Sequence, residues 1–351
     1  MVTWREELAE QRPPWRSDAP DRLVLLGTAG GSNPKANRCG FSNAVVVGDA
    51  VYVVDCGEGV HRQLWRAGLT VNSRHGSDRP VLRAVFVTHL HADHMMDLPN
   101  LFQGSWLSTP VDLYGPGPAG PPFTTHDDPI HPVRFPDDPA PGIATVMDHF
   151  HRAFATNINS RIVGEGRADY LDLLSVHEIE LGEAGGFDRS TADFVVPPVE
   201  PFVVRPEDEH GVTVTATLAQ HAPVFPAFSF RFDTPAGSVV FSGDTGECEN
   251  VVRLARGADV LVHEVIDLDA LLDRYGHLPN AERIRHQLSR SHTSVHDVGA
   301  IASRAGVGTL VLSHIVPADG PRTTDEWEEL ARGQFTGRVV CAVDLDEIPI
   351  G

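Results

Sequence analysis

Short apolar runs rich in valine, leucine and isoleucine recur along the chain, and most of them end in a glycine or a polar residue. Runs of this length and composition are typical of strands that are buried on both faces of a sheet. On this pattern we predict strands at residues 23–26, 43–47, 51–54, 81–88, 111–114, 212–219, 228–233, 238–242, 260–262 and 310–312. Helices are predicted at residues 61–67, 95–105 and 146–162.

The order of these segments predicts one large domain behind a short lead-in. A chain of 351 residues, of which 41% are hydrophobic, can bury a substantial core. Proline-rich sequence makes residues 1–20 a lead-in, and residues 21–351 predict a single domain. Residues from about 115 to 206 hold many prolines, glycines and paired acids, so we predict an inserted lid or cap over the site.

The chain lacks the features of an exported or membrane protein. No apolar run reaches the length of a membrane span, and the first residues contain no signal-peptide core. We therefore expect a cytoplasmic protein without membrane contact, and we expect it to form a homodimer. The four cysteines form no Cys-x-x-Cys pair, which predicts buried free thiols rather than a zinc knuckle or disulfides.

Charge argues against a large nucleic-acid partner. The formal net charge is −20, and Lys35 is the only lysine in the chain. A groove that neutralises many phosphates needs clustered lysine and arginine residues, whereas the arginines here are scattered among acids. Nucleic acid is therefore disfavoured as a partner, although a local arginine patch on the folded surface stays open.

The predicted strand 81–88 runs directly into a cluster of metal-binding side chains. The sequence from Thr88 is Thr-His-Leu-His-Ala-Asp-His, so His89, His91, Asp93 and His94 follow one another closely. In extended chain the two histidines of His-x-His point the same way, and the following Asp-His pair lies where the chain turns into a helix. Imidazole and carboxylate donors suit zinc, and also iron or manganese, better than calcium. A histidine-rich surface loop is the alternative.

Other predicted strands end in further metal-binding residues. His221 follows the strand 212–219, Asp244 follows the strand 238–242, and His314 follows the strand 310–312. Because several strands do this in one chain, we predict a composite site for two metal ions. One ion would bind His89, His91 and His221, the other would bind Asp93, His94 and His314, and Asp244 would lie between them.

Two other stretches belong near this site. Asp55 follows the strand 51–54 and either holds a ligand histidine in place or simply ends the strand. The residues 27–32, Gly-Thr-Ala-Gly-Gly-Ser, predict a tight turn that faces the site, with nucleotide binding as the weaker alternative.

These motifs, in this order, resemble those of the metallo-β-lactamase superfamily, and within it the ribonuclease Z and arylsulfatase-like branch. The resemblance extends over nearly the whole chain from Leu23 onward. Besides His-x-His-x-Asp-His, it rests on Asp55-Cys56-Gly57-Glu58-Gly59, Ser242-Gly243-Asp244-Thr245, His263-Glu264, Ser291-His292-Thr293-Ser294 and Ser313-His314. It implies an α+β fold, the four-layer αβ/βα sandwich, with two divalent metal ions, Zn2+ first and Mn2+ or Fe2+ as alternatives.

The resemblance also implies a set of catalytic residues, namely Asp55, Asp93, Glu264 and His292. In the branch that the chain resembles, the residue matching His292 acts with the one matching Glu264 at the leaving group. The aspartate matching Asp55 braces the site. Arg290 and Ser291, which precede His292, depart from the small residue and glycine expected there.

Metal chemistry together with the resemblance predicts hydrolysis of an ester bond. Two cations bridged by one carboxylate bring the pKa of a bound water toward neutrality, which suits phosphodiesters, sulfate esters and lactones alike. We favour a small-molecule ester, because ribonuclease Z uses a basic arm to hold tRNA and the predicted insertion is acidic and contains no lysine. A ribonuclease Z-type endonuclease acting at the 3′ end of tRNA is the alternative.

Substrate contacts are harder to assign. Phe225, Phe228, Asn157 and Arg161 are candidate pocket residues, with core packing or solvent exposure as the alternative for each. The sequence fits two other classes of protein less well. A di-iron oxidoreductase is expected to have a glutamate where His91 stands, and an inactive scaffold is expected to have lost metal ligands.

Overall fold

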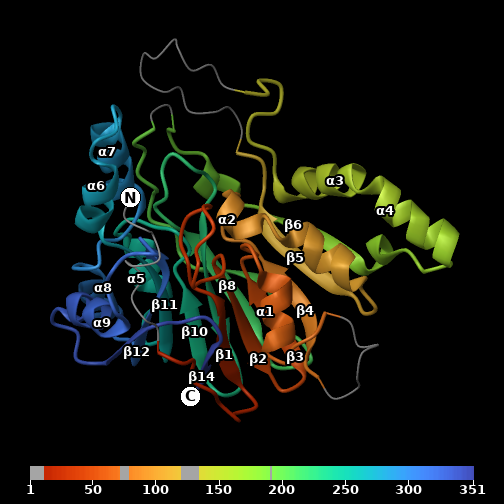
Figure 1. Ribbon diagram of the computed structural model, residues 1–351, viewed down its shortest axis with the longest axis horizontal. Coiled ribbons are helices and arrows are strands. Elements are labelled where there is room, and N and C mark those ends of the chain that lie inside the picture. The colour runs from red at the N-terminus through yellow and green to blue at the C-terminus, as the bar shows by residue number, and fades with distance from the viewer. Residues whose placement is uncertain (1–11, 72–78, 120–133, 190–191) are drawn as a thin grey trace.

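Two mixed sheets face one another and helices cover their outer faces (Figure 1). The computed structural model describes residues 12–71, 79–119, 134–189 and 192–351. The arrangement of helix, sheet, sheet and helix confirms the predicted α+β fold, the four-layer αβ/βα sandwich.

The first sheet contains seven strands in the order β14-β1-β2-β3-β4-β5-β6. The strands β3 to β6 run parallel, whereas β14, β1, β2 and β3 pair antiparallel. Their bounds are β1 Arg22–Gly27, β2 Ser42–Val47, β3 Ala50–Val54, β4 Val81–Phe86, β5 Val111–Pro116, β6 Leu174–Ile179 and β14 Asp346–Pro349.

The second sheet also contains seven strands, in the order β13-β12-β11-β10-β9-β8-β7. Here β10 to β13 run parallel, and β7 to β10 pair antiparallel. Their bounds are β7 Phe202–Arg205, β8 Thr213–Leu218, β9 Phe228–Asp233, β10 Ser238–Phe241, β11 Val260–Ile266, β12 Thr309–Val316 and β13 Arg338–Cys341.

Helices pack on the outer face of each sheet. On the first sheet these are α1 Val60–Arg66 and α3 Ile143–Ala153, and on the second they are α5 Glu249–Leu254, α8 Val298–Ala305 and α9 Thr324–Arg332. The other α-helices of the described residues are α2 Ala92–Met95, α4 Ala155–Asn159, α6 Leu268–Tyr275 and α7 Ala281–Ser291. Within the described ranges, none of the helices is both long and apolar enough to cross a membrane.

The core consists of three apolar layers that match the three interfaces between the four structural layers. One layer lies between the sheets, and each of the other two lies between a sheet and its helices. Strand β1 shows why its sequence is apolar throughout: Leu23 and Leu25 face the opposite sheet, while Val24 and Leu26 face the helices. A strand buried on both faces needs apolar residues at every position.

The stretch predicted as an insertion, residues 115–206, also supplies sheet strands that the sequence analysis missed. Strand β6 lies at one edge of the first sheet and β7 at the edge of the second. The helix predicted at residues 146–162 is present as α3 and α4, with a break at Phe154. These two helices project from the body of the molecule beside β5 and β6 (Figure 1). The role of a lid stays a prediction.

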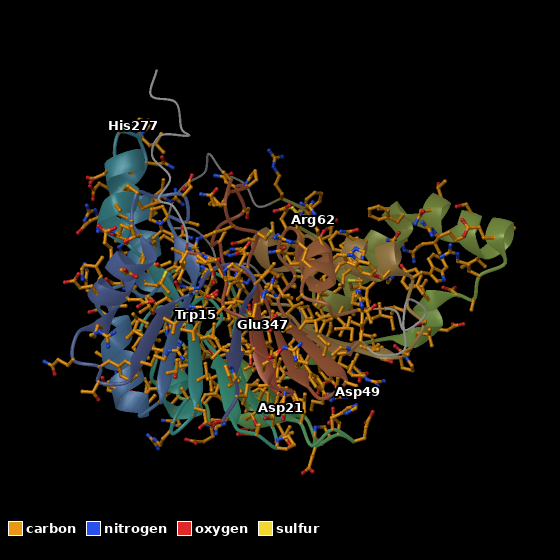
Figure 2. The ribbon with its side chains drawn as sticks, turned by 60° about the horizontal axis from the view of Figure 1, so that its bottom comes forward. Trp15, Asp21, Asp49, Arg62, His277 and Glu347 are labelled. Carbon is orange, nitrogen blue, oxygen red and sulfur yellow. The ribbon has the colours of Figure 1, made fainter. Side chains whose placement is uncertain are left out.

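The lead-in segment is held against the last strand of the first sheet. The Arg12 guanidinium donates to Asp346, with Nη1 to Oδ1 at 2.8 Å, and Arg16 Nη1 donates to Glu347 Oε1 at 2.8 Å. The backbone N–H of Glu347 donates to the carbonyl of Trp15, and the two residues lie close together in Figure 2. Residues 1–11 of the predicted lead-in lie outside the described residues.

The layer between the sheets offers a test of the fold. Phe86 is fully buried, stacks on Tyr114 with ring centroids 4.9 Å apart, and meets Phe230 and Phe232 edge-on. Phe86→Ala should lower the free energy of unfolding by about 3–5 kcal/mol in urea titrations, because the cavity cannot close between two rigid sheets. Phe135→Ala, at a side chain that is 81% exposed, should change it by less than about 0.5 kcal/mol. Equal effects would contradict this packing.

Candidate metal centre

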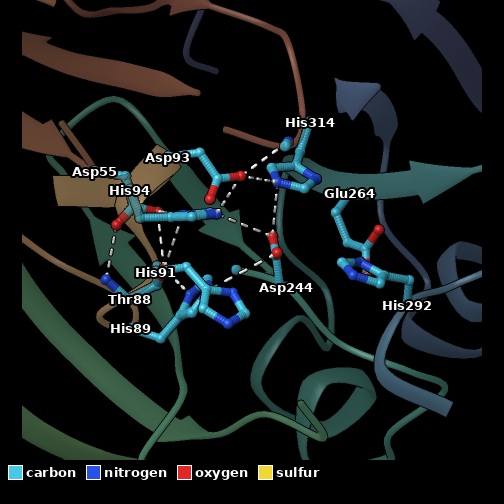
Figure 3. Close-up of polar contacts among 12 residues, drawn as sticks. Asp55, Thr88, His89, His91, Asp93, His94, Asp244, Glu264, His292 and His314 are labelled. Carbon is cyan, nitrogen blue, oxygen red and sulfur yellow. Dashed lines mark hydrogen bonds and ion pairs between the residues drawn. The ribbon is translucent and has the colours of Figure 1, made fainter. Parts of the chain in front are cut away.

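Polar residues from both sheets meet beyond the ends of their strands (Figure 3). Asp55 follows β3, and residues 89–94 follow β4 of the first sheet. In the second sheet His221 follows β8, Asp244 follows β10, and His314 lies in β12. All seven predicted ligand residues are therefore brought to one place by strands that lie far apart in the sequence.

Four side chains form the first group of candidate ligands, namely His89, His91, His221 and Asp244. His91 Nδ1 lies 3.0 Å from His89 Nε2 and 3.2 Å from His221 Nε2. Asp244 Oδ2 lies 3.8 Å from each of these two Nε2 atoms. Ligand atoms on one tetrahedral zinc ion lie about 3.3 Å apart at the usual bond lengths, so the spacing fits a single ion.

Asp93, His94 and His314 form the second group, and Asp244 lies next to it. Asp93 Oδ2 lies 3.7 Å from His94 Nε2 and 3.4 Å from His314 Nε2. The second oxygen of Asp244, Oδ1, lies 3.4 Å from His94 Nε2 and 3.3 Å from His314 Nε2. One carboxylate oxygen of Asp244 therefore faces each group, as a bridging ligand requires.

Some ligand atoms of the two groups have no hydrogen-bond partner among the described residues, which is what a site for cations requires. Nε2 of His94 and Oδ1 of Asp244 are buried, and neither has a hydrogen-bond partner within the described parts of the chain. A buried polar atom without a partner is costly, and a cation would satisfy the lone pairs of both atoms. Nitrogen and carboxylate-oxygen donors suit zinc, iron and manganese. The residues are thus compatible with a dinuclear site of divalent ions.

Hydrogen bonds behind the rings determine which imidazole nitrogen faces the centre. His94 Nδ1 donates to Asp55 Oδ2 at 2.9 Å, and the Thr88 hydroxyl donates to the same oxygen at 2.8 Å. Because that hydroxyl gives its proton to Asp55, it accepts from His89 Nδ1 at 3.1 Å. His221 Nδ1 donates to a backbone carbonyl at the end of α7 at 2.9 Å. Each of the three rings therefore presents an unprotonated Nε2 to the centre.

Electrostatics hold His89, His91, His221 and Asp244 in the forms that bind metal. At His94 burial would lower the pKa, but Asp244 and Asp55 outweigh burial and raise it. Burial lowers the pKa of His89 and of His91, and it lowers the pKa of His221 to about 3. Burial alone would raise the pKa of Asp244, but the neighbouring histidines outweigh burial and hold this pKa well below its ordinary value. Neutral imidazole and ionised carboxylate are the forms that coordinate a cation.

The glycine-rich turn at residues 27–32 faces the site, as predicted, and holds Asp93. Gly31 N–H donates to Asp93 Oδ2 at 2.8 Å, and the Ser32 hydroxyl donates to Oδ1 at 3.2 Å. Gly30 has no room for a side chain, because a Cβ atom there would lie 2.6 Å from His314 Nδ1. These glycines therefore allow close approach of the backbone to the centre.

The sequence analysis placed the turn 27–32 at the site but assigned no role to Gly31 or Ser32, and it assigned none to Thr88. Thr88 N–H donates to Asp55 Oδ1 at 2.8 Å, so this residue holds Asp55 with both its backbone and its hydroxyl. The available signal was the position of Thr88, a hydroxyl residue directly before the first ligand histidine. The available signal for the turn was its glycine content alone.

His292 and Glu264 form a pair beside the first ligand group. His292 directly follows α7, and its Nδ1 lies 3.0 Å from Glu264 Oε1. The same oxygen accepts hydrogen bonds from the backbone N–H groups of Thr245 and Thr293 at 3.0 and 3.2 Å. The centroid of the His292 ring lies 5.2 Å from that of His221. The predicted partners therefore meet, and Glu264 is firmly oriented.

Glu264 favours the protonated form of His292. Burial alone would lower the pKa of His292, but Glu264, with further contributions from Asp244 and Asp93, raises this pKa to about 9. Cations bound to the two ligand groups would offset the contributions of Asp244 and Asp93, whereas that of Glu264 would persist. A protonated imidazole is the form that a general acid needs.

The four candidate substrate contacts lie outside these groups. Phe228 is fully buried in the layer between the sheets and is a core residue. Phe225 packs on Phe187 with ring centroids 5.3 Å apart. Asn157 and Arg161 line a groove beside α4.

Fold and site together define a metal-dependent hydrolase of ester bonds. The model of the family described as the metallo-beta-lactamase superfamily matches residues 37–283. The chain therefore belongs to the metallo-beta-lactamase superfamily.

Among its relatives are proteins named Ribonuclease Z. That of Mycobacterium bovis (strain BCG / Pasteur 1173P2) is 32% identical over 328 residues, which cover 93% of this chain and 98% of the relative. That of Mycobacterium marinum (strain ATCC BAA-535 / M) is 30% identical over 334 residues, 93% of this chain and 98% of the relative.

Solved structures share the fold at lower identity. Human tRNase Z, short form, has a TM-score of 0.55 at 19% identity, with 94% of this chain and 99% of that chain covered. The metallo-beta-lactamase fold protein YhfI from Bacillus subtilis has a TM-score of 0.54 at 18% identity, with the same coverage.

These relatives correct the predicted substrate. Our preference for a small-molecule ester, and our view that a nucleic-acid partner is disfavoured, are wrong in the light of relatives named Ribonuclease Z. The metal ligands do not reveal which ester is the substrate, because bound ions would act only on the bond that is broken and not on the rest of the substrate. The net charge of −20 describes the whole chain, whereas binding of RNA depends on the residues next to the site. The arylsulfatase-like resemblance stays a prediction.

Asp55 offers a test of the centre. Asp55→Asn should weaken metal binding about 10- to 100-fold, because an amide cannot accept from His94 and Thr88 as a charged carboxylate does. Competition with a chromophoric chelator measures the affinity for zinc. Asp49→Asn is the matched control, since the side chain of Asp49 is 75% exposed (Figure 2). Unchanged affinity in Asp55→Asn would mean that Asp55 only ends β3.

Proposed function

We propose that the chain is a ribonuclease Z-type endonuclease that hydrolyses a phosphodiester bond near the 3′ end of tRNA. The single observation that carries the proposal is identity of 32% over 93% of this chain and 98% of a relative named Ribonuclease Z. The grouping of all seven predicted ligand residues at one site supports the same activity. The cytoplasmic location and the homodimer predicted from the sequence stay predictions.

We assign two metal ions to the site, with zinc as the first choice. One ion would be held by His89, His91 and His221. The other ion would be held by Asp93, His94 and His314, and Asp244 would bind both ions. When bound, the two ions supply Lewis-acid chemistry, which activates a water as nucleophile and stabilises the negative charge that develops on the phosphate.

The roles of the protein side chains follow from their contacts. Asp93 is oriented by Gly31 and Ser32, so it can accept a hydrogen bond from the attacking water. Protonated His292, paired with Glu264, would donate its Nε2 proton to the departing oxygen of the RNA. Asp55 accepts a hydrogen bond from the His94 ring and, through the Thr88 hydroxyl, also orients the His89 ring. It therefore acts by positioning the ligands.

Incubation of the metal-loaded protein with a tRNA precursor that has a 3′ trailer tests the proposal. The expected result is one endonucleolytic cut near the end of the acceptor stem, which sequencing of the products would locate. Bis(p-nitrophenyl) phosphate serves as a parallel substrate that reports on the metal centre alone. Hydrolysis of this small diester without cleavage of any precursor would overturn the proposal.

Asp244→Ala tests the bridging carboxylate. We expect a loss of activity of at least about 100-fold together with a metal content below about one ion per chain, because each ion loses a ligand. Elemental analysis and circular dichroism would measure metal content and secondary structure. Asp233→Ala, at a half-exposed carboxylate in β9, is the control. A fully active Asp244→Ala variant would refute the bridging role.

Glu264→Gln tests the general acid through pH. The amide keeps an oxygen for the two backbone N–H groups but removes the negative charge beside His292. Loss of that charge destabilises the imidazolium, so the pKa of His292 falls and the protonated form is lost at lower pH. The alkaline limb of the kcat profile should therefore move to lower pH than in the wild type. A limb that stays in place would exclude His292 as the acid.

A further inference from the structure

A groove with a volume of 620 Å³ lies between the segment that follows the metal motif and the projecting helices α3 and α4. One wall contains Met96 and Gln103, and the other contains Phe150, Phe154 and Arg161. In Figure 1 the helices α3 and α4 extend outward from the edge of the first sheet, beside β5 and β6. None of these residues belongs to the two ligand groups.

We propose that this groove binds an unpaired nucleotide of the RNA substrate, stacking the base on Phe154, hydrogen-bonding its edge to Gln103 and pairing a phosphate with Arg161. The inference rests on the proposed function, because it names a binding subsite for the same substrate.

The apolar walls of the groove are unusually open to solvent. Met96 is 55% exposed and Phe154 is 44% exposed, although both are large apolar side chains. Large apolar side chains that border a groove commonly mark a binding site rather than packing. A base offers a flat apolar face, and stacking of such a face on an aromatic ring is a main source of affinity for single-stranded RNA.

Gln103 provides a buried donor that has no acceptor in the part of the chain that the structure describes. The residue is 5% exposed, and its Oε1 accepts from Asn157 Nδ2 at 3.2 Å. Its Nε2 is buried and, within the described residues, has no hydrogen-bond partner. An unsatisfied buried donor is costly unless a ligand supplies an acceptor. Carbonyl oxygens and ring nitrogens on the edge of an unpaired base are acceptors of this kind.

Arg161 places a positive charge next to that donor. Its Nε lies 3.4 Å from Asn157 Oδ1, so one amide connects Arg161 with Gln103. The guanidinium lies 5.6 Å from the centroid of the Trp106 ring. Among the described residues no carboxylate forms an ion pair with Arg161, which leaves its charge available for a phosphate. In a chain with a net charge of −20, a cation of this kind is a specific point of attraction for RNA.

The groove is connected to the metal centre through the chain. Met96 lies two residues after His94, and its backbone N–H donates to the carbonyl of Ala92 within α2. The short helix that carries the candidate ligands Asp93 and His94 is therefore followed directly by Met96 of the groove.

Calorimetric titration with adenosine 5′-monophosphate and with ribose 5-phosphate tests the subsite directly. Both probes carry a phosphate, so the difference between their affinities isolates the contribution of the base. We expect the wild type to bind adenosine 5′-monophosphate more tightly than ribose 5-phosphate. Phe154→Ala and Gln103→Leu should each weaken binding of the nucleotide about 10-fold. Binding of ribose 5-phosphate should change by less than about 2-fold.

Arg161→Gln should weaken both probes about equally, since it removes a phosphate contact. Phe135→Ala and Arg152→Gln are the matched controls, because both side chains are exposed and lie outside the groove. With precursor tRNA, the groove variants should raise KM about 10-fold and leave kcat and metal content unchanged.

Two results would overturn the inference: equal affinity of the wild type for the two probes, or nucleotide affinity unchanged by Phe154→Ala and Gln103→Leu. A wild type that binds the nucleotide through these residues but cleaves no precursor would instead refute the proposed function. The two failures are therefore distinguishable.

Discussion

The structure depends on one electrostatic constraint, the gathering of imidazole and carboxylate groups in a buried space at the junction of the two sheets. The described ion pairs of Asp55, Asp93 and Asp244 are all with histidines, and in the neutral form that binds metal these histidines carry no charge to balance the carboxylates. Desolvation of such groups is costly unless cations neutralise them. Folding and metal binding are therefore expected to be linked, and the four-layer frame supplies the rigidity that holds the donors together.

Asp55 shows how the frame transmits order to the site. It is fully buried at the end of β3 and adopts φ 61°, a left-handed conformation that aspartate tolerates better than most residues. From there its two oxygens take hydrogen bonds from both donor groups of Thr88 and from His94. Burial raises the pKa of Asp55, while its contacts with His94 and Thr88 oppose that rise. One residue between adjacent parallel strands thus orients rings that serve both ligand groups.

Much of this arrangement could be predicted from the sequence, because it depends on local patterns. Most central strands could be predicted from apolar runs in the sequence. The metal ligands could then be predicted from the histidine or aspartate at the end of several of these runs. All four edge strands, β6, β7, β13 and β14, were missed. Strands β6 and β7 lie in sequence rich in proline and charge, and the pairing of each edge strand depends on a sheet edge formed elsewhere in the chain. The roles of Thr88 and Ser32 were missed because a hydroxyl has no distinctive spacing, and its partner is known only after folding.

The error about the substrate has a different origin. Net charge is an average over the surface, whereas recognition depends on a few side chains in one place. Only the folded chain shows that Gln103, Asn157 and Arg161 are linked by hydrogen bonds beside exposed aromatic and thioether groups. An acidic protein can contact RNA at such points while its remaining surface repels the polymer. This combination would favour binding of a flexible single-stranded end over a long duplex, because an end exposes its bases and brings fewer phosphates near the acidic surface.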